Sequence, residues 1–324
     1  SSDAIVTVHT SAEAGATTII CGRDQDKLDE ACKEARAKGY EFVAYAADIA
    51  DMADCDRFIA QLVKDHGGVD FLINNAGRSI RRAIEASYDR FHDFERTMEL
   101  NYYGAVRLIM ALLPTMTERK QGQIINISSI GVLANAARFS AYVASKAALD
   151  AFTRCLSAEV KGSNIRTTAI YMPLVRTPMI APTKIYSYIP TWSPDDAADT
   201  VIKAIVDEPK SIATPLGTAA ALSYAVWPKL NDYILSKGFQ LFPSSTAAKG
   251  SKDKDRKSDK PTLEQVVALC EELHLGANVE IKPAGGNDEE VGRDVARAVA
   301  RLWPARLPPQ TRTPVWMVFT GWDR

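Results

Sequence analysis

The stretch "QIINISSIGVLANAARFSAYVASKAALDAF", residues 123–152, decides the fold class. It opens with a β-branched run that ends in two serines, and it continues into a helical pattern from Phe139 to Val160. Within that helix Tyr142 and Lys146 are one turn apart, so they share a face, and their neighbours are small. The stretch therefore predicts a strand–helix unit that directs a phenol and an amine into one space.

The same alternation of strand and helix continues on both sides of this stretch. Strand-like runs are "TTIICG", "EFVAYAAD", "VDFLINNAG" and "NIRTTAIYMP", amphipathic patterns lie between them, and Asp195 to Asp207 is a further helix. Such alternation predicts right-handed crossovers and a parallel sheet that is covered on both faces. The predicted fold class is α/β, a doubly wound parallel sheet of the Rossmann-like type, with its ligand site at the carboxyl ends of the strands.

Composition narrows the function classes. The 324 residues carry a net charge of -1, which gives no sign of a nucleic-acid partner. The five cysteines are scattered, without a Cys-x-x-Cys pair or a histidine cluster, which predicts reduced thiols in a cytoplasmic protein and no metal site. No signal peptide is expected, and the uncharged run from Ser211 to Pro228 contains Pro215 and Gly217, so we do not expect it to span a membrane.

The character of the sequence changes after Phe242. Residues 243–261 are rich in Ser, Lys and Asp and have almost no apolar side chains, which predicts a flexible linker. A basic patch that touches a membrane is the alternative, so peripheral membrane contact stays open, although the interleaved aspartates favour the linker. The predicted organisation is one α/β domain over residues 1–242, this linker, and a small αβα tail over residues 262–324.

Four polar residues could carry chemistry. An ammonium beside a phenol favours the phenolate, so Lys146 is expected to lower the pKa of Tyr142 and make it a better proton shuttle. Ser129 ends its strand, where it could hold a substrate oxygen, and Asn101 lies in the long helical region before that strand. Each feature alone is common in surface helices and strand ends, but the combination in this order favours a catalytic site.

With these residues in place, the chain resembles the short-chain dehydrogenase/reductase family. The motif "NNAG" at residues 74–77 matches the family, and so does the step from Ser129 to Tyr142. The resemblance implies a nicotinamide cofactor, with Tyr142 as the general acid for carbonyl reduction and Lys146 on the ribose hydroxyls. It also implies that Ser129 binds the carbonyl oxygen and that Asn101 positions a water in the proton relay.

The choice of cofactor depends on the end of the "TTIIC" strand. An acidic residue there would bind the ribose 2′-OH of NAD, whereas an arginine accommodates the 2′-phosphate of NADP. Gly22 and Arg23 occupy this position, which favours NADP, with Arg23 as an ordinary surface charge as the alternative. By resemblance Asp48 contacts the adenine ring. The other cofactor contacts that the family implies are Asn75, Ala76, Gly77, Tyr142, Lys146, Pro173, Val175 and Thr177.

The substrate is suggested by the segments "NNAGRSIRRAI" and "YMPLVRTPMIAPT", which are similar to those of bacterial fatty acyl-CoA reductases within the family. This similarity implies reduction of a fatty acyl-CoA thioester, or of a long-chain aldehyde, with NADPH. Arg78, Arg81 and Arg82 are candidates for the phosphates of coenzyme A, or else solvated surface charges. The apolar region from Ala213 to Phe242 suits a long acyl chain or ordinary core packing. Homo-oligomers are common in the family.

Two departures from the family leave alternatives open. The glycine-rich TGxxxGxG turn is not found, and the chain starts with "SSDAIVTVHTSAEAGA", so we expect an N-terminally incomplete domain without its first strand. The alternatives are thus a catalytically impaired fragment that cannot bind cofactor, or a generic alcohol or ketone dehydrogenase. The tail from Pro261 resembles part of a glycerophosphodiester phosphodiesterase, with Glu280 and Lys282 at matching positions, but one strand and two helices cannot close a barrel, and we assign it no activity.

Overall fold

The computed structural model of this chain describes residues 17–39, 41–176 and 191–241. The chain divides into two compact units, Ser1–Asp232 with Ser244–Lys254, and Tyr233–Pro243 with Asp255–Arg324. The expectations for the N-terminal segment, the linker, the tail and Thr177 lie outside the described residues. All elements below belong to the first unit except the last residues of α10.

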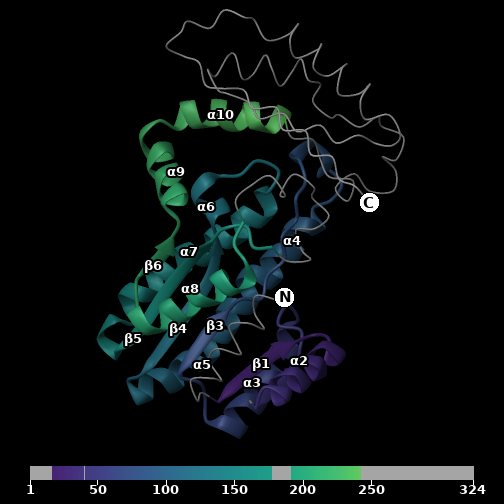
Figure 1. Cartoon of the computed structure of the whole chain (residues 1–324), viewed down its shortest axis with the longest axis vertical. Coiled ribbons are helices and arrows are strands. Elements are labelled where there is room, and N and C mark those ends of the chain that lie inside the picture. The colour runs from purple at the N-terminus through teal and green to yellow at the C-terminus, as the bar shows by residue number, and fades with distance from the viewer. Residues whose placement is uncertain (1–16, 40, 177–190, 242–324) are drawn as a thin grey trace, which may run out of the picture. The chain divides into compact units, whose positions relative to one another are not determined.

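The predicted parallel sheet is confirmed (Figure 1). Strand β1 (Thr18–Gly22) pairs with β2 (Phe42–Ala46), and the order β3-β4-β5-β6 forms a second, four-stranded piece. All four of these ladders are parallel, and among the described residues none joins β1 to β3. The bounds of the second piece are β3 (Phe71–Asn74), β4 (Gly122–Ser129), β5 (Ile165–Met172) and β6 (Ser211–Ala213), of which β6 was not foreseen from the sequence.

Helices cover both faces of the four-stranded piece, because the apolar side chains of its inner strand β4 point alternately to the two faces. In β4, Ile124 packs with α5 (Ala105–Arg119) and α7 (Ser140–Glu159). Ile125 and Ile127 point the other way and pack with α8 (Pro194–Asp207). Successive side chains of a strand face opposite sides, and β4 is buried from Gln123 to Ser129, so both of its faces are covered. This arrangement is the doubly wound fold that the sequence predicted.

The β1–β2 piece is wrapped in the same way by α2 (Gln25–Ala37) and α3 (Met52–His66). Both helices begin at an aspartate, since the Asp24 and Asp51 carboxylates accept hydrogen bonds from backbone N–H groups of the first turn. Helix α3 ends at Gly67, whose φ of 71° is the left-handed conformation that glycine adopts without strain. These local signals fix where the two helices begin and where α3 ends.

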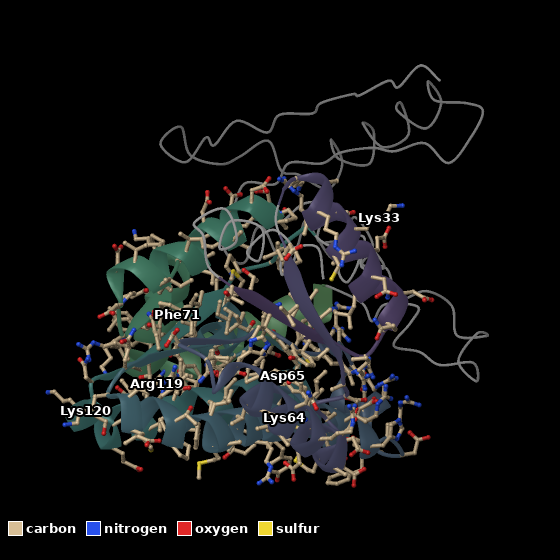
Figure 2. The ribbon with its side chains drawn as sticks, turned by 90° about the horizontal axis from the view of Figure 1, so that it is seen from below. Lys33, Lys64, Asp65, Phe71, Arg119 and Lys120 are labelled. Carbon is tan, nitrogen blue, oxygen red and sulfur yellow. The ribbon has the colours of Figure 1, made fainter. Side chains whose placement is uncertain are left out.

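Figure 2 shows the molecule from below, with Lys64 and Asp65 near the end of α3 and with Arg119 and Lys120 at the end of α5. Arg119 ties this end of α5 to the residues before β3, because its guanidinium donates to the Val69 carbonyl at 2.6 Å and lies 3.2 Å from the Asp70 carboxylate. These contacts belong to the amino ends of the strands. The predicted site lies at the opposite, carboxyl edge.

The region between β3 and β4 is interrupted, although the sequence suggested one long helix. It contains η1 (Ile84–Ala86), α4 (His92–Met98), a π-helical turn η2 (Glu99–Gly104) and then α5. Gly104 is required here, since a Cβ at this position would lie 2.6 Å from the Ile49 carbonyl oxygen. Single π turns occur frequently at functional sites, and this one contains Asn101.

The remaining helices follow the strands of the four-stranded piece. They are α6 (Ile130–Ala134), η3 (Lys161–Ser163), α9 (Pro215–Val226) and α10 (Pro228–Leu241). Much of the uncharged run from Ser211 to Pro228 is therefore helix α9. In the part of the chain that the structure describes, no helix is long and apolar enough to cross a membrane.

Candidate active site

The structure brings the four predicted catalytic residues to the carboxyl edge of the sheet from three elements. Ser129 is the last residue of β4, Tyr142 and Lys146 lie in α7, and Asn101 lies in η2. The Ser129 hydroxyl accepts a hydrogen bond from the Gly131 backbone at 3.1 Å, which fixes the turn from β4 into α6. It also hydrogen-bonds the Tyr142 phenol. The serine and the tyrosine can therefore act on one substrate atom.

The phenol differs from the expectation. Burial raises the pKa of Tyr142, and the hydrogen bond from Ser129 offsets only part of the rise. The expected lowering by an ammonium is wrong for this structure, because Lys146 does not contribute to the shift. A raised pKa keeps the phenol protonated at neutral pH, so Tyr142 is ready to donate a proton rather than accept one.

Lys146 is held against the backbone of β4. Its Nζ donates to the Ile127 carbonyl at 2.7 Å, and the side chain is buried. Burial lowers the pKa of Lys146 to about 8, so the neutral amine is well populated slightly above neutral pH. A buried lysine with one backbone partner has unused donors, since an ammonium carries three. It can therefore bind a further acceptor in the site.

Asn101 connects the two sides of the site. Its Oδ1 accepts from the Arg78 backbone at 2.7 Å, and its Nδ2 donates to the Arg78 carbonyl and the Ser145 hydroxyl, both at 2.9 Å. Ser145 in turn donates to the Tyr142 carbonyl at 2.7 Å. The amide thus fixes the loop after β3 against α7. Ser145 was regarded only as a small neighbour in the sequence, and its position directly before Lys146 was the signal available.

Gly77 is the point of closest approach. A Cβ there would lie 3.3 Å from the Lys146 Nζ and 3.4 Å from the Asn101 Oδ1. At the final glycine of "NNAG" the loop thus passes so close to the amine and the amide that an added methyl group would displace them by a few tenths of an ångström. Asn75 and Ala76 precede it on the same loop at the end of β3, as predicted. Asn74 is buried below them and donates to the Asn126 Oδ1 at 2.8 Å.

The residues predicted for the adenosine end lie at the ends of β1 and β2. Arg23 follows β1, and its guanidinium lies 3.5 Å from the carboxylate of Asp48, which follows β2. The Asp48 backbone N–H donates to Asp54 at 2.7 Å, which fixes the turn into α3. Both charged side chains are substantially exposed, so the pair itself adds little stability. An exposed arginine held at a strand end is available to an anion.

The loop after β5 contains Pro173 and Val175, two further predicted cofactor contacts. It is fixed by a bridge to Trp192, whose backbone donates to the Leu174 carbonyl at 2.8 Å and accepts from Arg176 at 2.9 Å. Val175 is buried. The structure thus holds this loop on the strand edge that carries the tetrad.

The three arginines of "RSIRR" separate. Arg82 donates to the buried Asp93 carboxylate at 2.9 Å, and Arg90 adds a second bond at 3.2 Å. Burial alone would raise the pKa of Asp93, but these hydrogen bonds hold it below its ordinary value. Arg82 is therefore structural, and the prediction that it is solvated or binds a phosphate is wrong. Arg78 differs, since burial and then the nearby Arg96 and Arg23 lower its pKa, which places it in a cationic field.

A second polar cluster was not foreseen. The buried Asp150, one turn beyond Lys146 on α7, accepts a hydrogen bond from the Tyr171 hydroxyl at 2.6 Å and pairs with Arg154. Burial, together with the hydrogen bond to Asp150, raises the pKa of Tyr171 to about 12. This cluster joins α7 to the end of β5 behind the tetrad. It fixes the helix that carries Tyr142 and Lys146.

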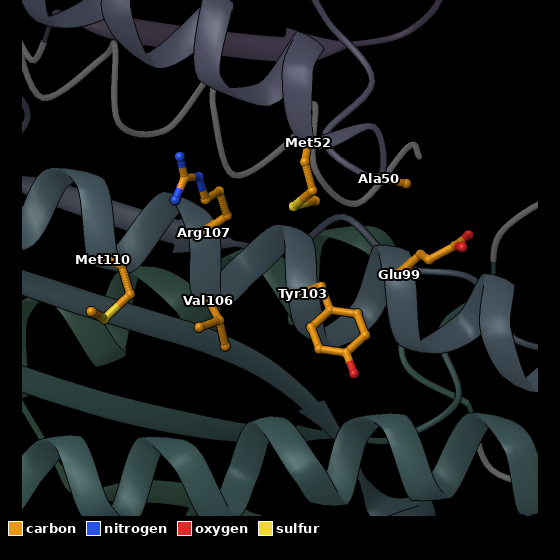
Figure 3. Close-up of a pocket in the computed structure, with 7 residues that line it drawn as sticks. All are labelled: Ala50, Met52, Glu99, Tyr103, Val106, Arg107 and Met110. Carbon is orange, nitrogen blue, oxygen red and sulfur yellow. The ribbon is translucent and has the colours of Figure 1, made fainter.

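Figure 3 shows a groove along η2 and α5. Arg107 on its rim is held by Asp56 through bonds of 2.5 and 2.7 Å. Its lining is Ala50, Met52, Glu99, Tyr103, Val106, Arg107 and Met110. No lining residue belongs to the predicted catalytic set, so we do not assign the reaction to this groove.

Comparison with known proteins identifies a matching family and a similar relative. Residues 5–185 match the model of the family described as short chain dehydrogenase. A protein named fatty acyl-CoA reductase from Acinetobacter baylyi is 60% identical over 243 residues, which is 75% of this chain and 82% of that protein.

Two solved structures are also similar. A short-chain dehydrogenase from Streptomyces avermitilis has a TM-score of 0.62 and 27% identity, and the match covers 73% of this chain and 94% of that one. An L-sorbose reductase from Gluconobacter frateurii, in complex with NADPH and L-sorbose, has a TM-score of 0.59 and 25% identity, with 65% and 89% covered. The architecture is thus shared with oxidoreductases of known structure.

Proposed function

From the premise that this chain belongs to the short-chain dehydrogenase family, we propose that it is an NADPH-dependent reductase that converts a fatty acyl-CoA thioester to a fatty aldehyde. The observation that carries the proposal is the hydrogen bond between Tyr142 and Ser129 beside the buried Lys146, at the carboxyl end of β4. The substrate class rests on the relative named fatty acyl-CoA reductase.

The residues present fit a nicotinamide cofactor. The loop passes close to Lys146 at Gly77, where no side chain stands between the backbone and the amine. The buried amine makes one backbone hydrogen bond and has donors left for ribose hydroxyls. Arg23 at the end of β1 would hold the 2′-phosphate, which is the basis for NADP rather than NAD. When bound, the cofactor supplies a hydride to the substrate carbon. Asp48, Asn75, Ala76, Pro173 and Val175 are proposed as further contacts, and Thr177 stays a prediction.

The chain's own residues would handle the oxygen and the proton. The Ser129 hydroxyl holds the thioester carbonyl oxygen, and the protonated Tyr142 phenol donates its proton to that oxygen as negative charge develops there. Collapse of the resulting hemithioacetal breaks the carbon–sulfur bond, and the hydroxyl proton leaves with coenzyme A as its free thiol. The reaction therefore consumes one proton, which returns to Tyr142 from solvent.

That returning proton needs a path. Both N–H donors of the Asn101 amide are engaged, with the Arg78 carbonyl and the Ser145 hydroxyl, and its Oδ1 already accepts from the Arg78 backbone, so the side chain has no donor left for a water. We therefore assign the water to a backbone carbonyl of the π turn around Asn101, since such turns disturb the regular hydrogen-bond ladder of a helix. In this role Asn101 is a positioning residue.

Of the three arginines, Arg78 is the one we assign to a phosphate of coenzyme A. Its backbone is fixed by Asn101 beside the site, and its guanidinium lies in the field of other arginines, which a phosphate would relieve. Arg166→Ala is the control, because Arg166 lies in an exposed ion pair with Glu208 near the amino end of β5. Arg78→Ala should raise the KM for acyl-CoA about tenfold and leave the KM for a free long-chain aldehyde unchanged.

The test of the proposed function is a stoichiometry. The full chain is mixed with NADPH and a long-chain acyl-CoA, and released thiol is titrated against NADPH consumed. We expect one thiol for each NADPH when only the first reduction occurs. NADPH consumption with simple ketones but none with acyl-CoA would instead support a generic dehydrogenase, and no consumption with either would support the impaired fragment.

A further inference from the structure

Arg138 has a strained backbone conformation beside the candidate active site. Its φ is 71°, in the left-handed region that glycine adopts freely and that other residues adopt only at a cost in free energy. Residues held in such conformations cluster at binding and catalytic sites. Arg138 directly precedes Phe139, whose ring centroid lies 6.2 Å from that of Tyr142. The strained position is therefore next to the proposed proton donor.

The loop after β3 connects this position to the buried amine of the site. It passes Lys146 at Gly77, where an added Cβ would lie 3.3 Å from the Lys146 Nζ. Further along the loop, the Arg82 backbone N–H donates to the Arg138 carbonyl at 2.6 Å. This hydrogen bond fixes Arg138 against the loop and brings it close to Arg81, the residue before Arg82. Two arginines from distant parts of the sequence thus meet beside the tetrad.

The side chains of these two arginines repel each other. Both Arg81 and Arg138 are half-buried. Burial lowers the pKa of Arg138, and the charge of Arg81 lowers it further, by more than the nearby Glu85 raises it. Because burial weakens the screening by solvent, two guanidinium groups in proximity cost free energy that a bound anion would offset. The pair is therefore suited to binding an anion.

A phosphate is the anion that such a pair fits best. A guanidinium donates two parallel N–H groups to phosphate oxygens, and a dianionic phosphate can accept from two arginines at once. Coenzyme A carries a diphosphate and a separate 3′-phosphate, so Arg78 alone cannot match its charge. Arg78 lies earlier on the loop that carries Arg81, and its own backbone is fixed by Asn101.

We infer that Arg81 and Arg138 form a second phosphate subsite, which binds a phosphate of coenzyme A in addition to the one assigned to Arg78. The identity of this ligand rests on the proposed function, whereas the subsite rests on the position and charge of the two arginines. The subsite also accounts for the strain at Arg138. A glycine there would relax the backbone but would remove the guanidinium.

The test is calorimetric titration of the cofactor-free full chain with free coenzyme A and, separately, with inorganic pyrophosphate. Arg138→Gly should raise the Kd for both ligands at least about tenfold, because charge-assisted hydrogen bonds are lost. Its midpoint of thermal unfolding should not fall, since glycine adopts a φ of 71° without strain. Arg81→Ala should weaken both ligands to a similar extent. The Kd for NADPH should stay unchanged in both variants.

Lys120→Gly is the matched control. Lys120 is also a cation at positive φ, 53°, but it lies at the end of α5 near the amino ends of the strands (Figure 2). The substitution therefore removes a positive charge and relieves similar backbone strain away from the proposed subsite. Lys120→Gly should bind coenzyme A and pyrophosphate as wild type does.

Several results would overturn the inference. These are wild type that binds neither coenzyme A nor pyrophosphate, an Arg138→Gly variant that binds coenzyme A as tightly as wild type, or a control that loses binding equally. If Arg138→Gly weakens NADPH as much as coenzyme A, the arginine serves the cofactor instead. Pyrophosphate binding that depends on Arg138 in a chain that does not bind coenzyme A would keep the phosphate subsite and contradict the proposed substrate. The two failures are thus distinguishable without measuring turnover.

Discussion

The two ends of the candidate site are built in opposite ways. At the reaction end, Ser129, Tyr142, Lys146 and Asn101 are held by mutual hydrogen bonds and by the backbone of Arg78 and Ile127. At the adenosine end, Arg23 and Asp48 form one exposed ion pair at 3.5 Å. The first arrangement fixes atoms in position, as catalysis requires, while the second leaves a charge accessible for binding. Substitutions should therefore reduce turnover at the first end and change cofactor preference at the second.

The largest effect is expected for Tyr142→Phe. Removing the proton donor should lower kcat by about 100- to 10,000-fold, since general acid catalysis contributes about that much. The thermal transition should show a folded protein. Tyr103→Phe is the control, because Tyr103 lies on the groove of Figure 3 and is 52% exposed, and it should keep full activity. Normal turnover in Tyr142→Phe would show that Tyr142 is not the proton donor.

Lys146 gives a prediction about stability and pH. Its pKa is about 8 when folded, against an ordinary value of 10.5, so between these values the unfolded chain binds more protons. The free energy of unfolding should therefore rise with pH across this window, by up to about 3 kcal/mol from this group alone. Lys146→Met removes the titration. The free energy of unfolding is measured in urea for the cofactor-free proteins. The value for Lys146→Met minus the value for wild type should be larger at pH 7 than at pH 10.

A difference between the two proteins that does not change with pH would mean that the amine is solvated in the folded state. The same variant should be inactive, because it cannot bind the ribose hydroxyls. Activity that survives with the stability difference in place would show that the buried lysine is structural only.

Arg23→Ala tests the adenosine end of the site. It should raise the Kd for NADPH about tenfold and leave the Kd for NADH nearly unchanged, because only NADPH presents a 2′-phosphate to the guanidinium. Arg166→Ala is the matched control, since Arg166 also forms an exposed ion pair, with Glu208, but near the amino end of β5. Fluorescence titration measures both. Equal losses for the two cofactors would mean that Arg23 is not at the 2′-position.

The smallest effect is expected for Gly77→Ala. The new methyl group would approach the Lys146 Nζ to 3.3 Å, which displaces the amine by a few tenths of an ångström. A misplacement of that size should lower kcat/KM by roughly threefold to tenfold. Gly162→Ala should have no effect on kcat/KM, because nothing lies within 4 Å of its added Cβ. A variant at Gly77 as active as the control would show that the loop can relax away from the amine.

The sequence was most informative where side-chain chemistry and local signals coincide. The βα order, the helix caps at Asp24 and Asp51, and the shared face of Tyr142 and Lys146 all follow from spacing and residue type. The pairing of Arg82 with Asp93 could not be foreseen, because it joins segments whose approach depends on packing. The raised pKa of Tyr142 was also missed, since burial rather than the neighbouring lysine decides it.

The exposed surface was the least predictable part. An uncharged run such as α9 is compatible with a core, an acyl-chain site or a lipid contact, and only the exposure of most of its residues in the folded chain excludes the core. The same holds for the short strand β6, which has three residues and no periodic pattern to mark it. Both features depend on how distant elements pack.

The most direct measurement of the central claim follows the hydride. The full chain is incubated with a long-chain acyl-CoA and NADPH that carries deuterium at the transferable C4 position, and the lipid products are analysed by mass spectrometry. The account predicts a fatty aldehyde with one deuterium on C1, together with one equivalent of free thiol, and loss of both in Tyr142→Phe. Free thiol with unlabelled fatty acid would show hydrolysis of the thioester instead, and would contradict the proposed reductase.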